Sequence, residues 1–164
     1  MDNIQATLIA QGIKARQAAR ILATASTTLK NQALLNMADQ LEADSQEILK
    51  ANGLDLEMGG QQGLSAALLE RLTLTDSRIR DMAQGLRDIA ALPDPIGETI
   101  ESSRRPNGLD ISRVRTPLGV IGIIYESRPN VTADAAALCL KSGNAILLRG
   151  GEEALNSNRA IARI

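Results

Sequence analysis

Residues 115–152 read RTPLGVIGIIYESRPNVTADAAALCLKSGNAILLRGGE, and this stretch decides the fold. Two short apolar runs, at 119–125 and 145–149, flank a helical pattern at 131–141. A strand, a helix and a second strand in this order are typical of a parallel sheet with crossover helices. In open sheets of this kind, ligands bind outside the carboxyl ends of the strands. We therefore expect the chemistry of the chain in the two loops that follow these strands.

The loop after the second strand offers groups that suit a nucleotide. The pair Gly150-Gly151 leaves backbone N–H groups uncovered beside a helix start, where anions are favoured. The guanidinium of Arg149 matches a phosphate, and Glu152 can accept hydrogen bonds from sugar hydroxyls. A tight strand-to-helix connection, with Glu152 complementing the helix dipole, explains the same residues without a ligand. The turn has neither a GxxxxGK[ST] nor a GxGxxG motif, so both interpretations stay open.

The loop after the first strand brings further polar groups to the same edge of the sheet. Tyr125 ends the apolar run, Glu126 and Ser127 follow it directly, and we place all three on the cofactor side. Arg128 is either a surface arginine or a group that grips a carboxylate or phosphate. Asn130 is expected to cap the following helix and can also contact a substrate. We therefore place Arg128 and Asn130 on the substrate side.

The only cysteine, Cys139, lies in the helical pattern among apolar residues. No basic group or helix amino terminus is near it in sequence, so we interpret it as a small buried residue rather than a nucleophile. A single cysteine forms no internal disulfide, and nothing indicates an oxidising compartment. The chain lacks a recognisable secretory signal, and its longest apolar run, 120–125, is too short to cross a bilayer. A cytoplasmic location is predicted.

The composition is that of an ordinary globular protein and excludes several functions. The 164 residues are 44% hydrophobic and 23% charged, which suits one packed domain. A net charge of -1, one Tyr and no Trp or Phe give no reason to expect nucleic acid or membrane binding. Because the chain has no His, it contains no histidine metal site and no histidine general base.

Residues before about 92 show helical spacing. Asn52-Gly53 predicts a turn or a helix end, and the glycine-rich residues 56–63 predict a flexible loop. The expected helices begin at the amino terminus, near Ser26, at Asp44, after Ser65 and at Thr75.

From residue 96 the period changes. Residues 96–102 and 109–115 alternate like strands on either side of Asn107-Gly108, which is a strong hairpin signal. A last helical pattern begins at Glu152 and has no stop signal before the end of the chain, so we expect a longer protein.

The segments RTPLGVIGIIYESRPNV and LCLKSGNAILLRGGEEA closely resemble the gamma-glutamyl phosphate reductase family of the aldehyde dehydrogenase superfamily. The likeness extends to NMADQLEADSQEILKANGLD and LSAALLERLTLTDSRI, so it covers nearly the whole chain. It implies an α/β fold with a helical amino-terminal layer, a protruding β-hairpin and the start of a Rossmann-like parallel sheet. On this basis residues 1–95 are the helical part of a cofactor-binding domain, and residues 117–164 are the first βαβ unit of that domain. Residues 96–116 between them are an oligomerisation arm.

The resemblance also implies an activity, the NADPH-dependent reduction of L-glutamyl 5-phosphate to L-glutamate 5-semialdehyde in proline biosynthesis. In the family, a cysteine thiolate attacks the acyl phosphate and hydride then reduces the thioacyl enzyme. That cysteine is expected beyond Ile164, so the chain itself should be inactive. The implied cofactor is NADPH/NADP, the implied substrate is a small molecule, and the implied assembly is a homo-oligomer formed through the hairpin.

The resemblance assigns roles to particular residues. Arg149 stands where aldehyde dehydrogenases carry a lysine, and Glu152 matches the glutamate that holds the adenosine ribose. Residues 126–128 replace the usual proline-tryptophan-asparagine, which leaves Asn130 as the nearest amide for an oxyanion. A related aldehyde dehydrogenase acting on another aldehyde, and a non-catalytic nucleotide-binding or assembly module, remain alternatives.

Overall fold

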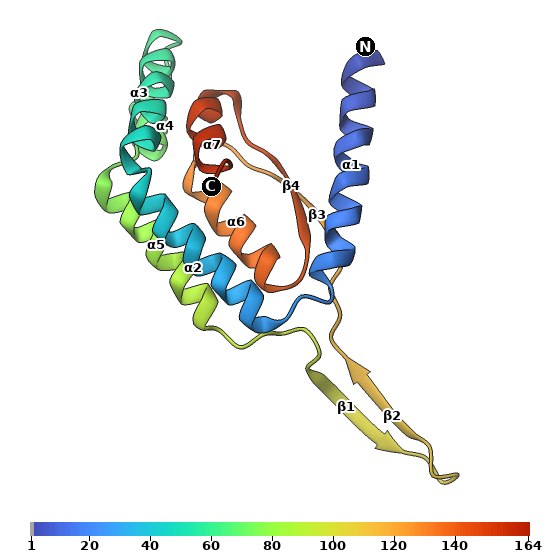
Figure 1. Ribbon diagram of the computed structural model, residues 1–164. Helices are drawn as coiled ribbons and strands as arrows, with labels where there is room; N and C mark the ends of the chain where they lie inside the picture. The colour runs from blue at the N-terminus through green and yellow to red at the C-terminus, as the bar shows by residue number, and fades with distance from the viewer. Residues whose placement is uncertain (1) are drawn as a thin grey trace.

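The structure is a computed structural model that describes residues 2–164, with side chains from residue 4. It combines a helical layer, a two-stranded parallel sheet and a projecting antiparallel hairpin (Figure 1). The α/β class expected from the sequence is confirmed. The elements, in chain order, are α1 (Asp2–Leu22), α2 (Thr27–Ala43), α3 (Ser45–Gln61), α4 (Ala66–Leu72), α5 (Asp76–Ala91), β1 (Thr99–Arg104), β2 (Asp110–Val114), β3 (Val120–Ile124), α6 (Asn130–Lys141), β4 (Ala145–Arg149), the short 3-10 helix η1 (Glu152–Ala154) and α7 (Leu155–Ile161).

Helices α2 and α5 lie side by side and hold most of the core (Figure 1). Each begins where a hydroxyl oxygen accepts a backbone hydrogen bond, Ser26 from Leu29 and Thr75 from Arg78, as predicted. Helix α6 packs on the same layer, so the sheet is anchored to it from one side. The apolar side chains buried in this layer include Leu34, Ala38, Leu41, Ile79, Met82 and Leu86.

The expected break at Asn52-Gly53 is wrong, and so is the flexible loop at 56–63, because α3 runs through Gly53 and most of the second segment. Asn52 is buried. Its amide nitrogen donates to the Leu72 carbonyl at 2.8 Å, and its oxygen accepts from the Leu74 N–H at 2.8 Å. Because the side-chain amide of Asn52 makes these tertiary bonds, it does not compete for the backbone groups of its own helix, and the helix continues through Asn52.

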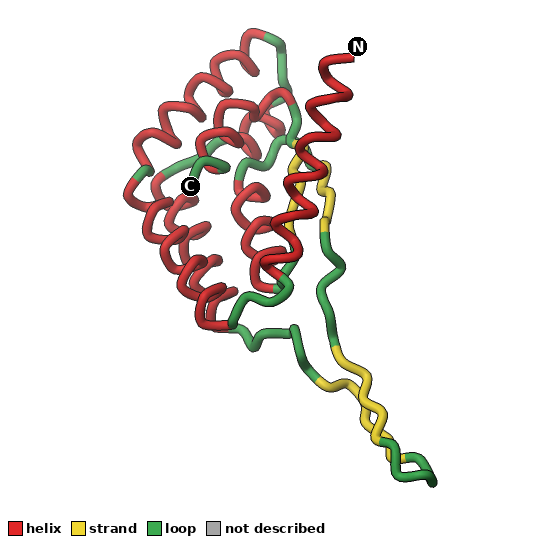
Figure 2. Tube along the Cα trace, turned by 45° about the vertical axis from the view of Figure 1, so that its right-hand side comes forward, coloured by secondary structure: helices red, strands yellow, loops and turns green. Residues whose placement is uncertain are grey.

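The hairpin of β1 and β2 forms as predicted and projects from the rest of the molecule (Figures 1 and 2). Its pairing ends with Arg104 opposite Asp110. Gly108 has a φ of 86°, which glycine adopts without strain and which the tight turn requires. Apolar side chains on the ribbon, Ile100 and Ile111, are exposed.

Two buried lysines fix the region where the hairpin leaves the helical layer. Lys30 Nζ lies 2.6 Å from the Asp94 carboxylate. Lys141 Nζ donates to the Ala90 carbonyl at 2.8 Å and to Asn31 at 2.6 Å. Burial lowers the pKa of Lys141, and the Asp94 charge opposes this only in part. The base of the arm is therefore tied to α2, α5 and α6.

Helix α1 forms as predicted, but its apolar face is exposed. Ile4, Leu8 and Ile13 each leave at least 55% of their surface open to solvent. The helix instead rests on β4, and its buried positions are Ala15 and Ala19. Nowhere in residues 2–164 is there a helix with the length and apolar content to span a membrane.

A buried carboxylate joins α3 to the start of α7. Asp55 is 2% exposed and accepts hydrogen bonds from the backbone N–H groups of Asn156 and Ser157 at 3.1 and 2.7 Å. The side chains of the same two residues donate to it at 2.8 and 2.6 Å. Since α7 follows the loop that leaves β4, Asp55 fixes the far side of that loop.

We expect Asp55→Ala to lower the free energy of unfolding by about 3 kcal/mol, because four donors, two of them buried, lose a charged acceptor. Asp55→Asn should give a smaller loss. Urea denaturation would measure both, with Glu57→Ala as a control because Glu57 is exposed on the same helix. Equal losses in the Asp55→Ala and Glu57→Ala variants would contradict this account.

Candidate cofactor and substrate site

The carboxyl ends of β3 and β4 lie side by side, as the sequence predicts. The strands pair in parallel with Ile124 opposite Arg149. The Tyr125 N–H donates to the Arg149 carbonyl at 3.1 Å, so the pairing continues to the start of both loops. The loops at 125–129 and 150–153 therefore leave the sheet at one edge, where parallel α/β sheets bind ligands.

A carboxylate joins the two loops. Glu153 Oε1 accepts hydrogen bonds from the Ser127 N–H at 2.5 Å and from Ser127 Oγ at 2.9 Å. Ser127 is buried with a φ of 48°, in the left-handed region that non-glycine residues rarely adopt. Such a conformation costs about 1–3 kcal/mol, and the two bonds offset part of that cost. Glu153 thus holds the first loop in one shape.

Glu153 was not among the residues predicted from the sequence, whereas its neighbour Glu152 was. Burial by itself raises the pKa of Glu153, but bonds from its own N–H and from Ser127, with the charge of Arg149, lower the pKa below its ordinary value. The carboxylate is therefore ionised at neutral pH. The signal available in the sequence was the pair of adjacent acids, Glu152 and Glu153, after Gly150-Gly151.

Both glycines of the second loop lie against side chains that hold the loops. A Cβ at Gly150 would displace the amide of Asn158 on α7, and one at Gly151 would displace the Glu153 carboxylate. This close packing exists without any ligand, which favours the simpler of the two interpretations left open for the glycine pair.

Tyr125 points back into the protein. Its hydroxyl lies 2.6 Å from Thr132 Oγ1, which in turn lies 3.1 Å from Asn158 Oδ1. The network links the first loop to α6 and α7. Tyr125 therefore supports the loops, and a cofactor contact by its half-buried ring stays a prediction.

Four of the selected charged side chains are exposed at this edge. Among residues 4–164, the side chains of Arg149 and Glu152 make no hydrogen bond or ion pair, so both are available to a ligand. A guanidinium and a carboxylate three residues apart in one loop suit a phosphate and sugar hydroxyls, so the two side chains fit a nucleotide. The four residues are Glu126, Arg128, Arg149 and Glu152.

The substrate-side pair faces a different space. Arg128 and Asn130 line a polar cavity of about 350 Å³ together with α4 and α5, and none of residues 149–152 lines it. Asn130 is not the helix cap that was expected. Pro129 occupies the cap position, and Asn130 is the first residue of α6. The side-chain amide nitrogen of Asn130 donates to Asp134 at 3.0 Å, which leaves its side-chain oxygen available.

Cys139 is buried in α6, as predicted. Burial raises the pKa of its thiol, which disfavours the reactive thiolate. No chemistry is assigned to it.

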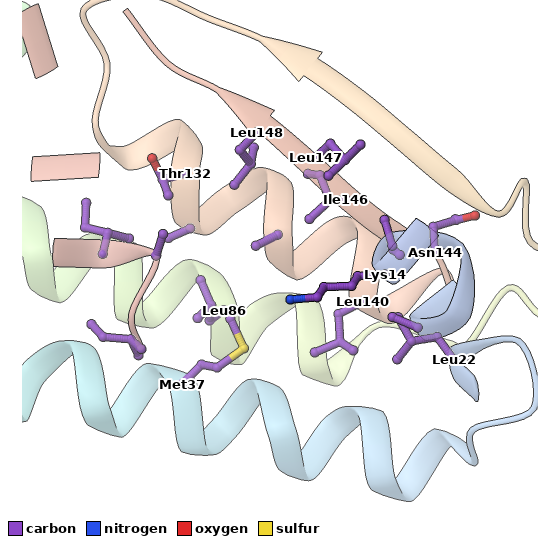
Figure 3. Close-up of a pocket in the computed structure, with 18 of the residues that line it drawn as sticks. Lys14, Leu22, Met37, Leu86, Thr132, Leu140, Asn144, Ile146, Leu147 and Leu148 are labelled. Atoms are coloured by element: carbon purple, nitrogen blue, oxygen red, sulfur yellow. The ribbon is translucent and has the colours of Figure 1, made fainter. Parts of the chain in front are cut away.

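A larger cavity, of about 690 Å³, lies away from the strand ends, between α1, β4 and the helical layer (Figure 3). Its walls are mainly apolar, and the side chain of Lys14 extends among them. The oxygen of Asn144 in this wall already accepts from the Gly119 N–H at 2.8 Å. The cavity therefore offers few polar groups to orient a ligand, and the strand ends remain the candidate site.

Known proteins resemble the chain over almost its whole length. It is 71% identical over 162 residues to a gamma-glutamyl phosphate reductase of Syntrophomonas wolfei, covering 99% of this chain and 39% of the relative. The crystal structure of gamma-glutamyl phosphate reductase from Thermotoga maritima is 49% identical with a TM-score of 0.92, covering 94% of this chain and 37% of that one. The chain matches the amino-terminal part of gamma-glutamyl phosphate reductases.

A more distant structure supports the same fold. A probable aldehyde dehydrogenase from Listeria monocytogenes superposes with a TM-score of 0.62 at 18% identity, over 92% of this chain and 30% of that one. No family model matches the chain. The chain spans about two fifths of the length of the gamma-glutamyl phosphate reductases that it matches.

We expect Glu153→Gln to weaken the tie between the loops by about 1 kcal/mol at neutral pH, since a neutral acceptor replaces a charged one. The folded pKa of Glu153 is lowered, so its contribution is present above its ordinary pKa and is lost as pH falls below about 4.5. Below about pH 4.5, wild-type stability should therefore fall more steeply than that of the variant.

Urea midpoints at several pH values, with hydrogen exchange at the Ser127 amide, would measure this effect. Glu152→Gln is the matched control, because that side chain is exposed and has no partner among residues 4–164. A Glu153→Gln variant with the same pH profile as wild type would disprove the tie.

Proposed function

We propose that the complete protein reduces L-glutamyl 5-phosphate to L-glutamate 5-semialdehyde with NADPH and releases phosphate. The observation that carries this proposal is the 71% identity to a gamma-glutamyl phosphate reductase over 99% of the chain. The parallel strand pair supports it, because its two exit loops meet at the edge where dinucleotides bind in related folds.

The second loop is proposed to hold the cofactor. Arg149 would pair with a phosphate of NADPH, and Glu152 would accept hydrogen bonds from a ribose. Glu126, Ser127 and the backbone at Gly150-Gly151 would form the adjoining wall. When bound, the cofactor supplies hydride, while the residues of this chain bind and orient it.

The first loop is proposed to face the substrate. Arg128 carries a full charge that suits the acidic glutamyl phosphate, and Asn130 has an amide oxygen left over from its bond to Asp134. The nucleophilic cysteine is proposed to lie in the part of the relatives' length beyond this chain, since Cys139 is buried and its pKa is raised. Residues 1–164 alone should then be inactive.

The hairpin is proposed to take part in self-association. Its two strands leave both edges free, and Ile100, Leu109 and Ile111 are exposed on it. An apolar ribbon with open edges suits pairing with another copy. This part of the proposal is independent of the chemistry at the strand ends.

We expect the complete gene product to form NADPH from L-glutamate 5-semialdehyde, phosphate and NADP, and residues 1–164 to form none. Absorbance at the NADPH band would follow the reaction. Activity with simple aliphatic aldehydes but not with the glutamate semialdehyde would favour another aldehyde dehydrogenase. Binding of NADPH without turnover by the complete protein would favour a nucleotide-binding module.

Within the complete protein, we expect Arg149→Ala to raise the KM for NADPH by about 10- to 100-fold, the loss typical of a charged hydrogen bond. The KM for NADH should change little if Arg149 contacts the additional phosphate of NADPH. Arg159→Ala is a matched control, because Arg159 is exposed on α7. Unchanged values for both cofactors would remove Arg149 from the site.

A further inference from the structure

The polar cavity beside the first loop has an unusual set of charges. Of the charged residues that line it, Arg78 is fully engaged, because its guanidinium donates to the backbone oxygens of Glu70 and Thr73 at 2.7 and 2.6 Å. The same guanidinium lies 2.5 Å from the Glu70 carboxylate, which neutralises it. These two residues therefore form a wall rather than a binding group.

Three other charges in the cavity have no partner among residues 4–164. Arg71, at the end of α4, and Arg128, in the loop after β3, are free cations. Asp81, on α5, is a free carboxylate in the same cavity. The three side chains are exposed, and two cations with one carboxylate leave a surplus positive charge that suits an anion. The Asp81 carboxylate in turn suits a cation.

A ligand that satisfies all three groups carries a carboxylate and an ammonium on the same carbon atom, which is the head group of an α-amino acid. We infer that this cavity binds the α-amino acid end of the substrate, with Arg71 and Arg128 on its carboxylate and Asp81 on its ammonium. The inference rests on the proposed function and adds what selects the substrate. The cavity volume of about 350 Å³ is at the small end for ligand pockets and suits one amino acid.

The position of the cavity agrees with this assignment. Arg128 and Asn130 follow the carboxyl end of β3, so the cavity opens from the loop that borders the candidate cofactor edge. A glutamyl group held by its head in the cavity would extend its acyl end toward that edge. Buried Leu74 and Met82 line the cavity floor and suit the methylene groups between the two ends.

The test uses the complete gene product with three aldehydes, each with phosphate and NADP. They are L-glutamate 5-semialdehyde, 5-oxopentanoate, which lacks the amino group, and 4-aminobutanal, which lacks the carboxylate. Arg71→Gln should lower kcat/KM for the glutamate semialdehyde about 10- to 100-fold, mainly through KM, and leave 4-aminobutanal unaffected. Asp81→Asn should do the same for the glutamate semialdehyde and leave 5-oxopentanoate unaffected.

Two control variants change the same residue types on α5 outside the cavity, Arg80→Gln and Asp88→Asn, and should keep wild-type kinetics. Arg71→Lys should recover part of the loss, and the KM for NADP should not change. Equal losses with the natural aldehyde and the truncated one indicate a merely structural role and overturn the head-group assignment, as do unchanged constants. A wild-type protein inactive with the glutamate semialdehyde overturns the proposed function itself, and this inference with it.

Discussion

The parallel pairing of β3 with β4 is the constraint on which the site depends. Parallel strands place their carboxyl ends at one edge, and the register that sets Ile124 opposite Arg149 brings both exit loops level. Helix α6, which connects the strands, packs on the helical layer and so fixes the sheet to the core. A shift of one residue would turn every side chain of a strand to the other face and separate the loops.

Buried polar contacts then hold the loops from behind. Asp55 fixes the amino end of α7, and Asn52 bonds both to the segment before α5 and to Ser157 at 3.0 Å. Apolar packing alone is non-directional and leaves a loop free to slide, whereas a buried carboxylate with four donors accepts only one arrangement. The shape of the second loop is thus set by α3, which is far from it in sequence.

Local signals in the sequence were enough for most of the fold. Hydroxyl caps such as Ser26 and Thr75, the Asn107-Gly108 turn and the two apolar runs act over a few residues, and the structure agrees with them. The failure at Asn52-Gly53 has a long-range cause. The sequence predicts a turn or a helix end there, but the side-chain amide of Asn52 bonds to backbone groups 20 and 22 positions away. Such long-range partners leave no local trace in the chain.

The division of the candidate site into two sides has a structural counterpart. The sequence separates Arg128 and Asn130 from the other selected residues, and in the structure these two line a cavity that none of residues 149–152 reaches. Ser127 makes the division, because its left-handed φ sets the direction in which the chain continues to Arg128. Glu153, in the loop after β4, holds Ser127 in that conformation. The Glu153 carboxylate therefore also determines where Arg128 lies, so this one side chain couples the loop after β4 to the cavity that Arg128 lines.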